Sequence, residues 1–180
     1  IDYFANVYRI HKKCKRRWDQ VRRDNVDRNL MLVTGEKSGV MVLDLDTNIS
    51  KKYNAEESLK ILTEKYPFLE KCPMDKTVTD GYHIFLPYKK EFTRKDIHRI
   101  GDFLTNGSYC TLNCSSYRHK VTQEVGEVKW IRNPSDFPID KIEIPPEFNI
   151  ESLMNIFPKE KKEIIKSKKV KETNRFDGLL

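Results

Sequence analysis

The sequence predicts a mixed α+β fold, and three observations lead to this class. Two short apolar runs, at residues 29–33 and 40–46, flank a turn with glycine and serine, which predicts a strand, a hairpin turn and a second strand. Residues 55–66 have leucines at helical spacing, with Asn54 as a cap and Pro67 as the stop. Further strand-like runs come in pairs with helical segments between them, an order typical of the α+β class.

The remaining elements are expected in the following places. Residues 2–24 place apolar side chains among basic ones in a loosely amphipathic pattern, which predicts a helix that docks on the body. Isoleucine and leucine at helical spacing predict a helix over residues 93–104, and a last helix over residues 150–169 continues into a lysine-rich tail. Further strands are predicted at residues 77–79, 82–88, 108–112 and 126–131.

These elements divide the chain into three parts. Residues 1–28 are expected to form a basic helical segment that packs on the body, and residues 29–149 to form the core domain. Residues 150–180 are expected to form a C-terminal helix and a lysine-rich linker toward a further domain. A domain of this size buries enough surface to be stable without a disulfide or a structural metal.

Basic residues are concentrated near the two ends of this 180-residue chain, whose formal net charge is +7. Eight Lys or Arg and a single Asp lie between Arg9 and Arg23, and the lysine-rich tail is the second basic segment. Two basic arms around a mildly acidic middle are typical of a protein that binds a polyanion, although solvated basic helices have the same composition without any ligand. The residues of the first arm that we expect to bind nucleic acid are Lys12, Lys13, Lys15, Arg16 and Arg17.

Several classes of protein are excluded by the composition. No apolar run reaches the roughly 18 residues of a membrane span, and the first residues do not resemble a signal peptide, so we expect an intracellular protein without membrane contact. Cys110, Cys114 and His119 have a spacing that could supply three zinc ligands, but no fourth ligand is evident. We therefore expect reduced cysteines and no zinc site.

The first candidate site is the pair of carboxylates in Asp44-Leu45-Asp46. On a strand, residues two apart lie on the same face about 6.5–7 Å apart, so both carboxylates would face one side while Leu43 and Leu45 face the core. Two such carboxylates suit Mg²⁺ or Mn²⁺, and the pair fits a site of two metal ions for phosphoryl transfer. The alternative is a strand that runs into an acidic, solvated turn.

His83 is the second candidate. It follows Gly81 in an apolar strand, and a glycine allows the backbone to approach a ligand closely. An imidazole at this place could donate a hydrogen bond to a triphosphate. The alternative is a core histidine whose ring atoms are satisfied within the protein.

Three short segments stand out in order along the chain: 34–46 (TGEKSGVMVLDLD), 79–83 (TDGYH) and 102–109 (DFLTNGSY). Together they resemble the motifs of the primase-polymerase domain of the archaeo-eukaryotic primase superfamily, as found in viral and plasmid primase-helicases. The resemblance covers roughly residues 29–131, and three ordered motifs are more specific than any single one.

The resemblance implies an α+β catalytic domain of the archaeo-eukaryotic primase type, with an RRM-like sheet and flanking helices. It implies that Asp44, Asp46 and Asp102 are the catalytic residues and bind two Mg²⁺ or Mn²⁺ ions. The nucleotide-binding residues that it implies are Gly81, His83, Ser116, Arg118 and Lys120.

Two departures from the family pattern concern the third motif. Gly101 stands where a hydrophobic residue usually precedes the aspartate. A basic residue is often found soon after the aspartate, and the candidate positions hold Leu104, Cys110 and Thr111. If Asp102 lies on the helix predicted for this segment, it misses the metals, and Asp96 or Asp80 takes its place.

By this resemblance the chain is expected to be a nucleotidyltransferase, a DNA primase and DNA-directed polymerase that makes primers for the DNA replication of a virus or mobile element. The expected partners are a single-stranded DNA template, nucleoside triphosphates and a helicase domain in the same longer chain, at replication sites in the cell. Two alternatives of other classes stay open. One is a catalytically weak, primase-like module that binds nucleic acid or docks a helicase, and the other is an Asp-x-Asp glycosyltransferase.

Overall fold

The computed structural model describes the backbone of residues 7–11, 14–16, 29–47, 53–93, 95–97, 100–113, 115–119 and 122–157. For residues 7–11, 14–16 and 95, only the backbone is described. Within these ranges the chain forms two larger antiparallel sheets, a short hairpin and a layer of helices, so the predicted α+β class is confirmed.

The larger sheet has six strands in the described part of the chain, and β4 (Val40–Leu45) lies in its middle. The strand order is β12-β5-β6-β4-β8-β7, and all neighbours are antiparallel. The other strands are β5 (Met74–Lys76), β6 (Tyr82–Pro87), β7 (Lys95–Ile97), β8 (Gly101–Leu104) and β12 (Lys129–Arg132). Because β4 pairs with β6 on one side and with β8 on the other, its residues are fixed at the centre of the sheet.

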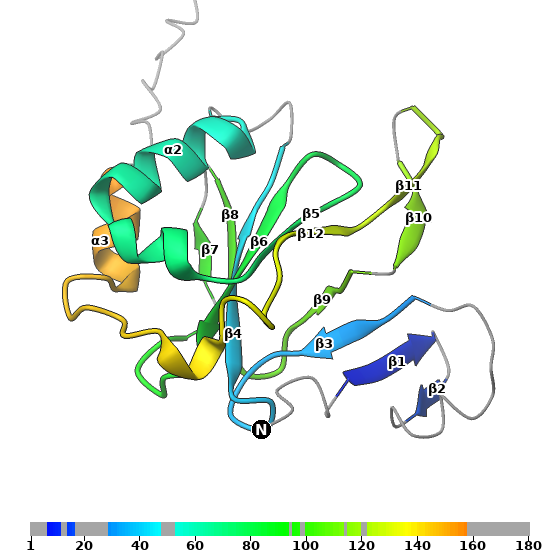
Figure 1. Ribbon diagram of the computed structural model, residues 1–180, viewed down its shortest axis with the longest axis horizontal. Helices are drawn as coiled ribbons and strands as arrows, with labels where there is room; N and C mark the ends of the chain where they lie inside the picture. The colour runs from blue at the N-terminus through cyan, green and yellow to red at the C-terminus, as the bar shows by residue number, and fades with distance from the viewer. Residues whose placement is uncertain are drawn as a thin grey trace, which may run out of the picture.

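One face of this sheet is covered by helices, which lie together on one side of it in Figure 1. The helix α2 (Ala55–Lys65) begins at Asn54, whose side chain accepts from the amide of Glu57 in a capping box, and it ends before Pro67, as predicted. The short helices η1 (Pro67–Lys71) and α3 (Ile150–Ile156) complete this layer. The sheet residues that are fully buried against it include Met41, Leu43, Leu45, Ile84, Leu86 and Phe103.

A second sheet packs against the opposite face of β4 and β6. Its strands, in spatial order, are β2 (Cys14–Arg16), β1 (Val7–His11), β3 (Met31–Val33) and β9 (Tyr109–Thr111). A smaller apolar cluster lies here and consists of Leu32, Val40, Val42, Phe85, Leu104, Cys110, Leu112 and, from the short helix η2 (Ile139–Lys141), Ile139. The hairpin of β10 (Ser116–Arg118) and β11 (Val125–Glu127) continues from β9 in Figure 1.

The N-terminal segment differs from its prediction. β1 and β2 are strands, so the helix predicted over residues 2–24 is wrong there. β1 pairs with β3, which is distant in sequence, and this pairing determines the conformation of β1. The local pattern of apolar residues contains no information about such a pairing. Of the predicted nucleic-acid-binding residues, Lys15 and Arg16 lie on β2, and those outside the described residues are Lys12, Lys13 and Arg17.

The third motif also differs from its prediction. β7 and β8 replace the single helix predicted over residues 93–104, so that prediction is wrong. Gly101 has a φ of +150°, far from helical values, and it begins β8 where this strand joins β4. As a result Asp102 lies on a strand, directly opposite Asp44.

The other strand predictions are confirmed in part. The runs 29–33 and 40–46 contain β3 and β4, but these strands belong to different sheets and are joined only by a bridge between Gly35 and Val40, so they form no hairpin ladder. Residues 77–79 belong to a turn after β5 instead of a strand. β6 and β9 lie where strands were expected. The single strand predicted over residues 126–131 is instead two short strands, β11 and β12, which belong to different sheets. The part of the last predicted helix beyond residue 157 lies outside the described residues.

Candidate active site

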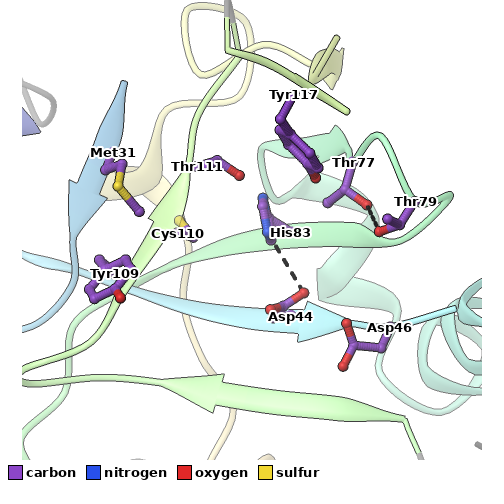
Figure 2. Close-up of a pocket in the computed structure, with 10 residues that line it drawn as sticks. All are labelled: Met31, Asp44, Asp46, Thr77, Thr79, His83, Tyr109, Cys110, Thr111 and Tyr117. Carbon is purple, nitrogen blue, oxygen red and sulfur yellow. Dashed lines mark hydrogen bonds and ion pairs between the residues drawn. The ribbon is translucent and has the colours of Figure 1, made fainter. Parts of the chain in front are cut away.

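Asp44 and Asp46 lie at the end of β4, where the sheet meets a hollow of about 250 Å³. Leu43 and Leu45 are fully buried in the apolar cluster under the helices, so the predicted alternation of this strand is confirmed. Asp44 is therefore directed to the opposite face. Figure 2 shows both carboxylates at the hollow.

A row of charged side chains crosses this face of the sheet. Residues directly opposite on antiparallel strands share a face, with Cα atoms about 4.5–5.5 Å apart. Asp44 is opposite His83 on β6 and opposite Asp102 on β8. His83 is in turn opposite Asp75 on β5, and Asp102 is opposite Asp96 on β7. The sheet thus brings residues of all three sequence motifs side by side.

His83 is only 4% exposed, and both of its ring nitrogens face carboxylates. Its Nδ1 lies 2.8 Å from Oδ1 of Asp75, and its Nε2 lies 3.7 Å from Oδ1 of Asp44, the contact drawn in Figure 2. Burial alone would lower the pKa of His83, but the close contact with Asp75 and the charge of Asp44 outweigh burial and raise the pKa to about 9. The raised pKa favours the cationic form of the ring, in which each nitrogen carries a proton.

The surroundings of Asp44 favour a bound cation. Burial is the main reason why the pKa of Asp44 is raised to about 6; His83 opposes this shift, whereas Asp46 and Asp102 add to it. Like charges directly opposite on neighbouring strands destabilise a sheet, and a cation between them removes the repulsion.

The donor set fits a divalent ion of the Mg²⁺ or Mn²⁺ type, because these ions prefer carboxylate oxygens. Within the described ranges, no three histidine, cysteine or acidic side chains are already gathered around one point. The carboxylates of Asp44, Asp46 and Asp102 are thus suited to an ion by chemistry and by their shared location, and binding would have to gather them.

Gly101 allows β8 to approach β4 closely. A Cβ at this position would collide with the carbonyl oxygen of Asp44, and the positive φ also disfavours any other residue. The departure from the family pattern at Gly101 therefore has a structural reason, because a glycine is what places Asp102 beside Asp44.

Gly81 has a similar role on the other side of β4. A Cβ on Gly81 would lie 2.5 Å from the carbonyl oxygen of Leu45 and 2.9 Å from Oγ1 of Thr77. The amide of Gly81 also donates to that hydroxyl at 2.9 Å. The glycine thus packs its turn against the end of β4, and it is not among the residues that line the hollow.

Most of the far wall of the hollow comes from residues outside the three sequence motifs, and only Thr79 and Tyr109 lie within them. Two of its sides are formed by the second sheet and by the turn after β5, in which the hydroxyls of Thr77 and Thr79 lie 3.2 Å apart. The second sheet contributes Met31, Tyr109, Cys110 and Thr111. Tyr109 is 52% exposed although it is a large aromatic residue. Sequence reasoning assigns none of these residues to this site, because only the packing of the two sheets brings them there.

The β10–β11 hairpin directs one of its residues to the hollow and turns two predicted ones away. Tyr117 lines the hollow, and its hydroxyl accepts from the amide of Val78 at 3.3 Å. Because successive residues of a strand face opposite sides, Ser116 and Arg118 lie on the other face of β10. Both are exposed, and Arg118 donates to a backbone carbonyl oxygen 2.6 Å away. The structure thus does not bring these two to the hollow, and Lys120 lies outside the described residues.

The two fallback aspartates are not needed beside Asp44. Asp80 is exposed, has a φ of 58° and pairs with Lys76 at 2.8 Å. Asp96 is exposed on the edge strand β7, at the end of the row. Asp75 is a further residue that sequence reasoning misses, because it belongs to no motif and is found only through its register with His83.

Comparison with known proteins identifies one family. The sequence model of the family described as "Bifunctional DNA primase/polymerase, N-terminal" matches residues 6–147, which is most of the chain and includes the three motifs. The resemblance seen in those motifs is thereby confirmed. A search of the curated proteins finds no match. In the described part of the chain, no helix is both long and apolar enough to cross a membrane.

Proposed function

The chain belongs to the family of bifunctional DNA primase/polymerase N-terminal domains, and from this premise we propose that it makes primers by nucleotidyl transfer in the hollow beside Asp44. A domain of this family acts on DNA and nucleotides. The observation that carries the proposal is the pairing of Asp44 with both His83 and Asp102 across three neighbouring strands. This register gathers several carboxylates and one cationic imidazole on one face, and phosphoryl transfer depends mainly on such positioned charges.

Asp44, Asp46 and Asp102 are the residues that we propose to hold two Mg²⁺ or Mn²⁺ ions. When bound, such ions lower the pKa of the attacking hydroxyl and stabilise pyrophosphate as it leaves. The fold supports this role because Asp44 lies on the central strand, which is paired on both sides. The backbone of Asp44 is therefore held directly opposite that of Asp102 by the ladder.

The incoming nucleotide is proposed to enter the hollow with its triphosphate toward His83. In the cationic form of the ring, which the raised pKa favours, Nε2 of His83 carries a proton and can donate a charge-assisted hydrogen bond to a phosphate oxygen. Met31 and the exposed ring of Tyr109 give the opposite wall an apolar surface for the sugar or the base. Ser116 and Arg118 take part only if the β10–β11 hairpin turns its other face inward.

The template strand is proposed to bind to the basic N-terminal arm, through the five Lys and Arg residues between positions 12 and 17. Contacts of this kind go to phosphates and weaken with salt, while pairing with the template selects the nucleotide. Lys120 is proposed as a further cation at the triphosphate. The primers would serve DNA replication of a virus or mobile element, with a helicase domain in the same longer chain.

The direct test is synthesis on an unprimed single-stranded DNA template with labelled nucleotides and Mg²⁺ or Mn²⁺, resolved on a gel. We expect short products with the wild type and none with Asp44→Ala/Asp46→Ala. The matched control is Asp136→Ala/Asp140→Ala, which removes the same charge from two exposed positions that do not line the hollow.

Other outcomes would narrow or overturn the proposal. Extension of a primed template without unprimed synthesis would restrict the function to that of a polymerase. If neither product forms and the template still binds in EDTA, the catalytic proposal is wrong, and the chain is a module that binds nucleic acid or docks a helicase.

A further inference from the structure

Asp75 is fully buried and has no part in the function described so far. It lies on the three-residue strand β5, and none of its surface is exposed. An ionised carboxylate is costly to bury, and a well-packed apolar side chain would often fill the same space at lower cost. A carboxylate at this position therefore indicates a specific partner.

That partner is His83. Oδ1 of Asp75 lies 2.8 Å from Nδ1 of His83, and the two residues are directly opposite each other in the β5–β6 register. On its other side, Asp75 is opposite Trp130, whose ring centroid lies 5.2 Å from that of Phe85. Aromatic residues thus close this end of the row, and the carboxylate faces the imidazole away from water.

The contact determines which ring nitrogen faces the hollow. In an imidazole, the partner that one nitrogen contacts fixes the direction in which the other nitrogen points. With Nδ1 directed to Asp75, Nε2 is directed to Asp44 and the hollow, as Figure 2 shows. A half-turn of the ring about its bond to Cβ would put carbon atoms in both places and lose both contacts.

We propose that Asp75 is a positioning residue, which holds the ring of His83 so that Nε2 faces a triphosphate in the hollow. The part of this inference that concerns the triphosphate rests on the proposed function. Carboxylates orient histidines in metal sites in the same way, and loss of such a carboxylate typically weakens binding or activity by about 10- to 100-fold.

The kinetic test compares Asp75→Asn with the wild type in the extension of a primed template. Asn keeps the size of Asp and removes its charge. Because His83 contacts the triphosphate before and during the reaction, we expect the KM for the nucleotide to rise about tenfold while kcat stays within about twofold. In a His83→Ala background, Asp75→Asn should change KM no further, because the two residues act as one unit.

The matched control is Met74→Ala. Met74 is the neighbour of Asp75 on β5, but it packs in the cluster under the helices, so this variant lowers stability without changing KM. A merely structural role of Asp75 would give the same result as this control. A KM that stays unchanged in Asp75→Asn, or that rises equally with and without His83, overturns the proposal.

A measurement without substrate separates this inference from the proposed function. ¹⁵N NMR of histidine-labelled protein reports the protonation of each ring nitrogen, and the signals lost in His83→Gln identify His83. We expect a proton on Nδ1 in the wild type, and shifted ring signals in Asp75→Asn but not in Met74→Ala. An unprotonated Nδ1, or unshifted signals in Asp75→Asn, overturns the inference even where synthesis is observed. The expected signals without any synthesis would support the positioning of His83 and contradict the proposed function.

Discussion

The two faces of β4 contribute differently to the molecule. On the face under the helices, Met41, Leu43 and Leu45 are all fully buried in the larger apolar cluster. On the other face, Val40 and Val42 are equally buried under the second sheet, but the third position is Asp44. One strand therefore supports the core with five of its six residues and the candidate site with one.

This difference explains how a small domain can contain a site whose buried charges lower its stability. The row of carboxylates around His83 disfavours folding, because burial and repulsion raise the free energy of its ionised groups. The apolar clusters on the same strands act in the opposite direction and fix the ladder. Asp44, His83 and Asp102 then take their relative positions from strands that other residues stabilise.

The largest loss of stability is expected where the helix-covered face is broken, in Leu43→Ala. The side chain of Leu43 is fully buried, and its removal leaves a cavity, so the free energy of unfolding should fall by about 3–4 kcal/mol. Urea denaturation measures this loss, and the primer assay at low temperature should still detect synthesis.

The matched change on the other face is Asp44→Asn. It removes a largely buried charge next to Leu43, so stability should stay the same or rise while synthesis is abolished. Equal losses of stability in Leu43→Ala and Asp44→Asn would contradict the account in which one face of β4 stabilises the fold and the other carries the site.

The next largest effect is expected from Gly101→Ala, which disturbs the junction of β8 with β4. The added Cβ collides with the carbonyl oxygen of Asp44, so we expect a loss of about 2–3 kcal/mol in stability and of most synthesis, because Asp102 is displaced. Gly107→Ala is the control: Gly107 also has a positive φ, of +78°, but no atom lies within 4 Å of a Cβ there. It should cost about 1 kcal/mol and leave synthesis intact, and a similar loss of synthesis in both variants would show that Gly101 has no special place in the site.

The difference between the two faces also explains how much could be predicted from the sequence. The alternation of β4 and the capped helix α2 depend on residues close in sequence, so the directions of Leu43 and Asp44 and the bounds of α2 were predictable. The position of Asp102 depends on Gly101, which lies against the backbone of β4. The helical spacing of apolar residues in this segment led to the prediction of a helix and gave no sign of this contact.

Two further features could not be predicted because they arise only from pairing between distant segments. β1 has its conformation because it pairs with β3, although its basic and apolar residues suggested a helix. Asp75 carries no motif, and only the β5–β6 register shows that it faces His83. The motifs thus predicted the carboxylates and the histidine that meet at the hollow, and only the pairing of strands shows which residues orient them.

The smallest effect is expected from the proton of Asp44, measured in metal-free protein. The pKa of this carboxyl is about 6 in the folded protein against an ordinary value of 3.8, so the folded state binds the proton more tightly than the unfolded chain does. The stabilisation that this proton provides is greatest below about pH 4, falls by about 2 kcal/mol between pH 4 and pH 6, and disappears above pH 6. Urea denaturation of the wild type and of Asp44→Asn in EDTA should show this loss in the wild type alone.

Above pH 6, Mn²⁺ should restore stability to the wild type more than to the variant, because the ion binds the ionised carboxylate. A difference between the two proteins that stays constant with pH would contradict this account. If the expected result is found, the face with Asp44 destabilises the fold only when its ions are missing, whereas the face with Leu43 supports the fold at every pH.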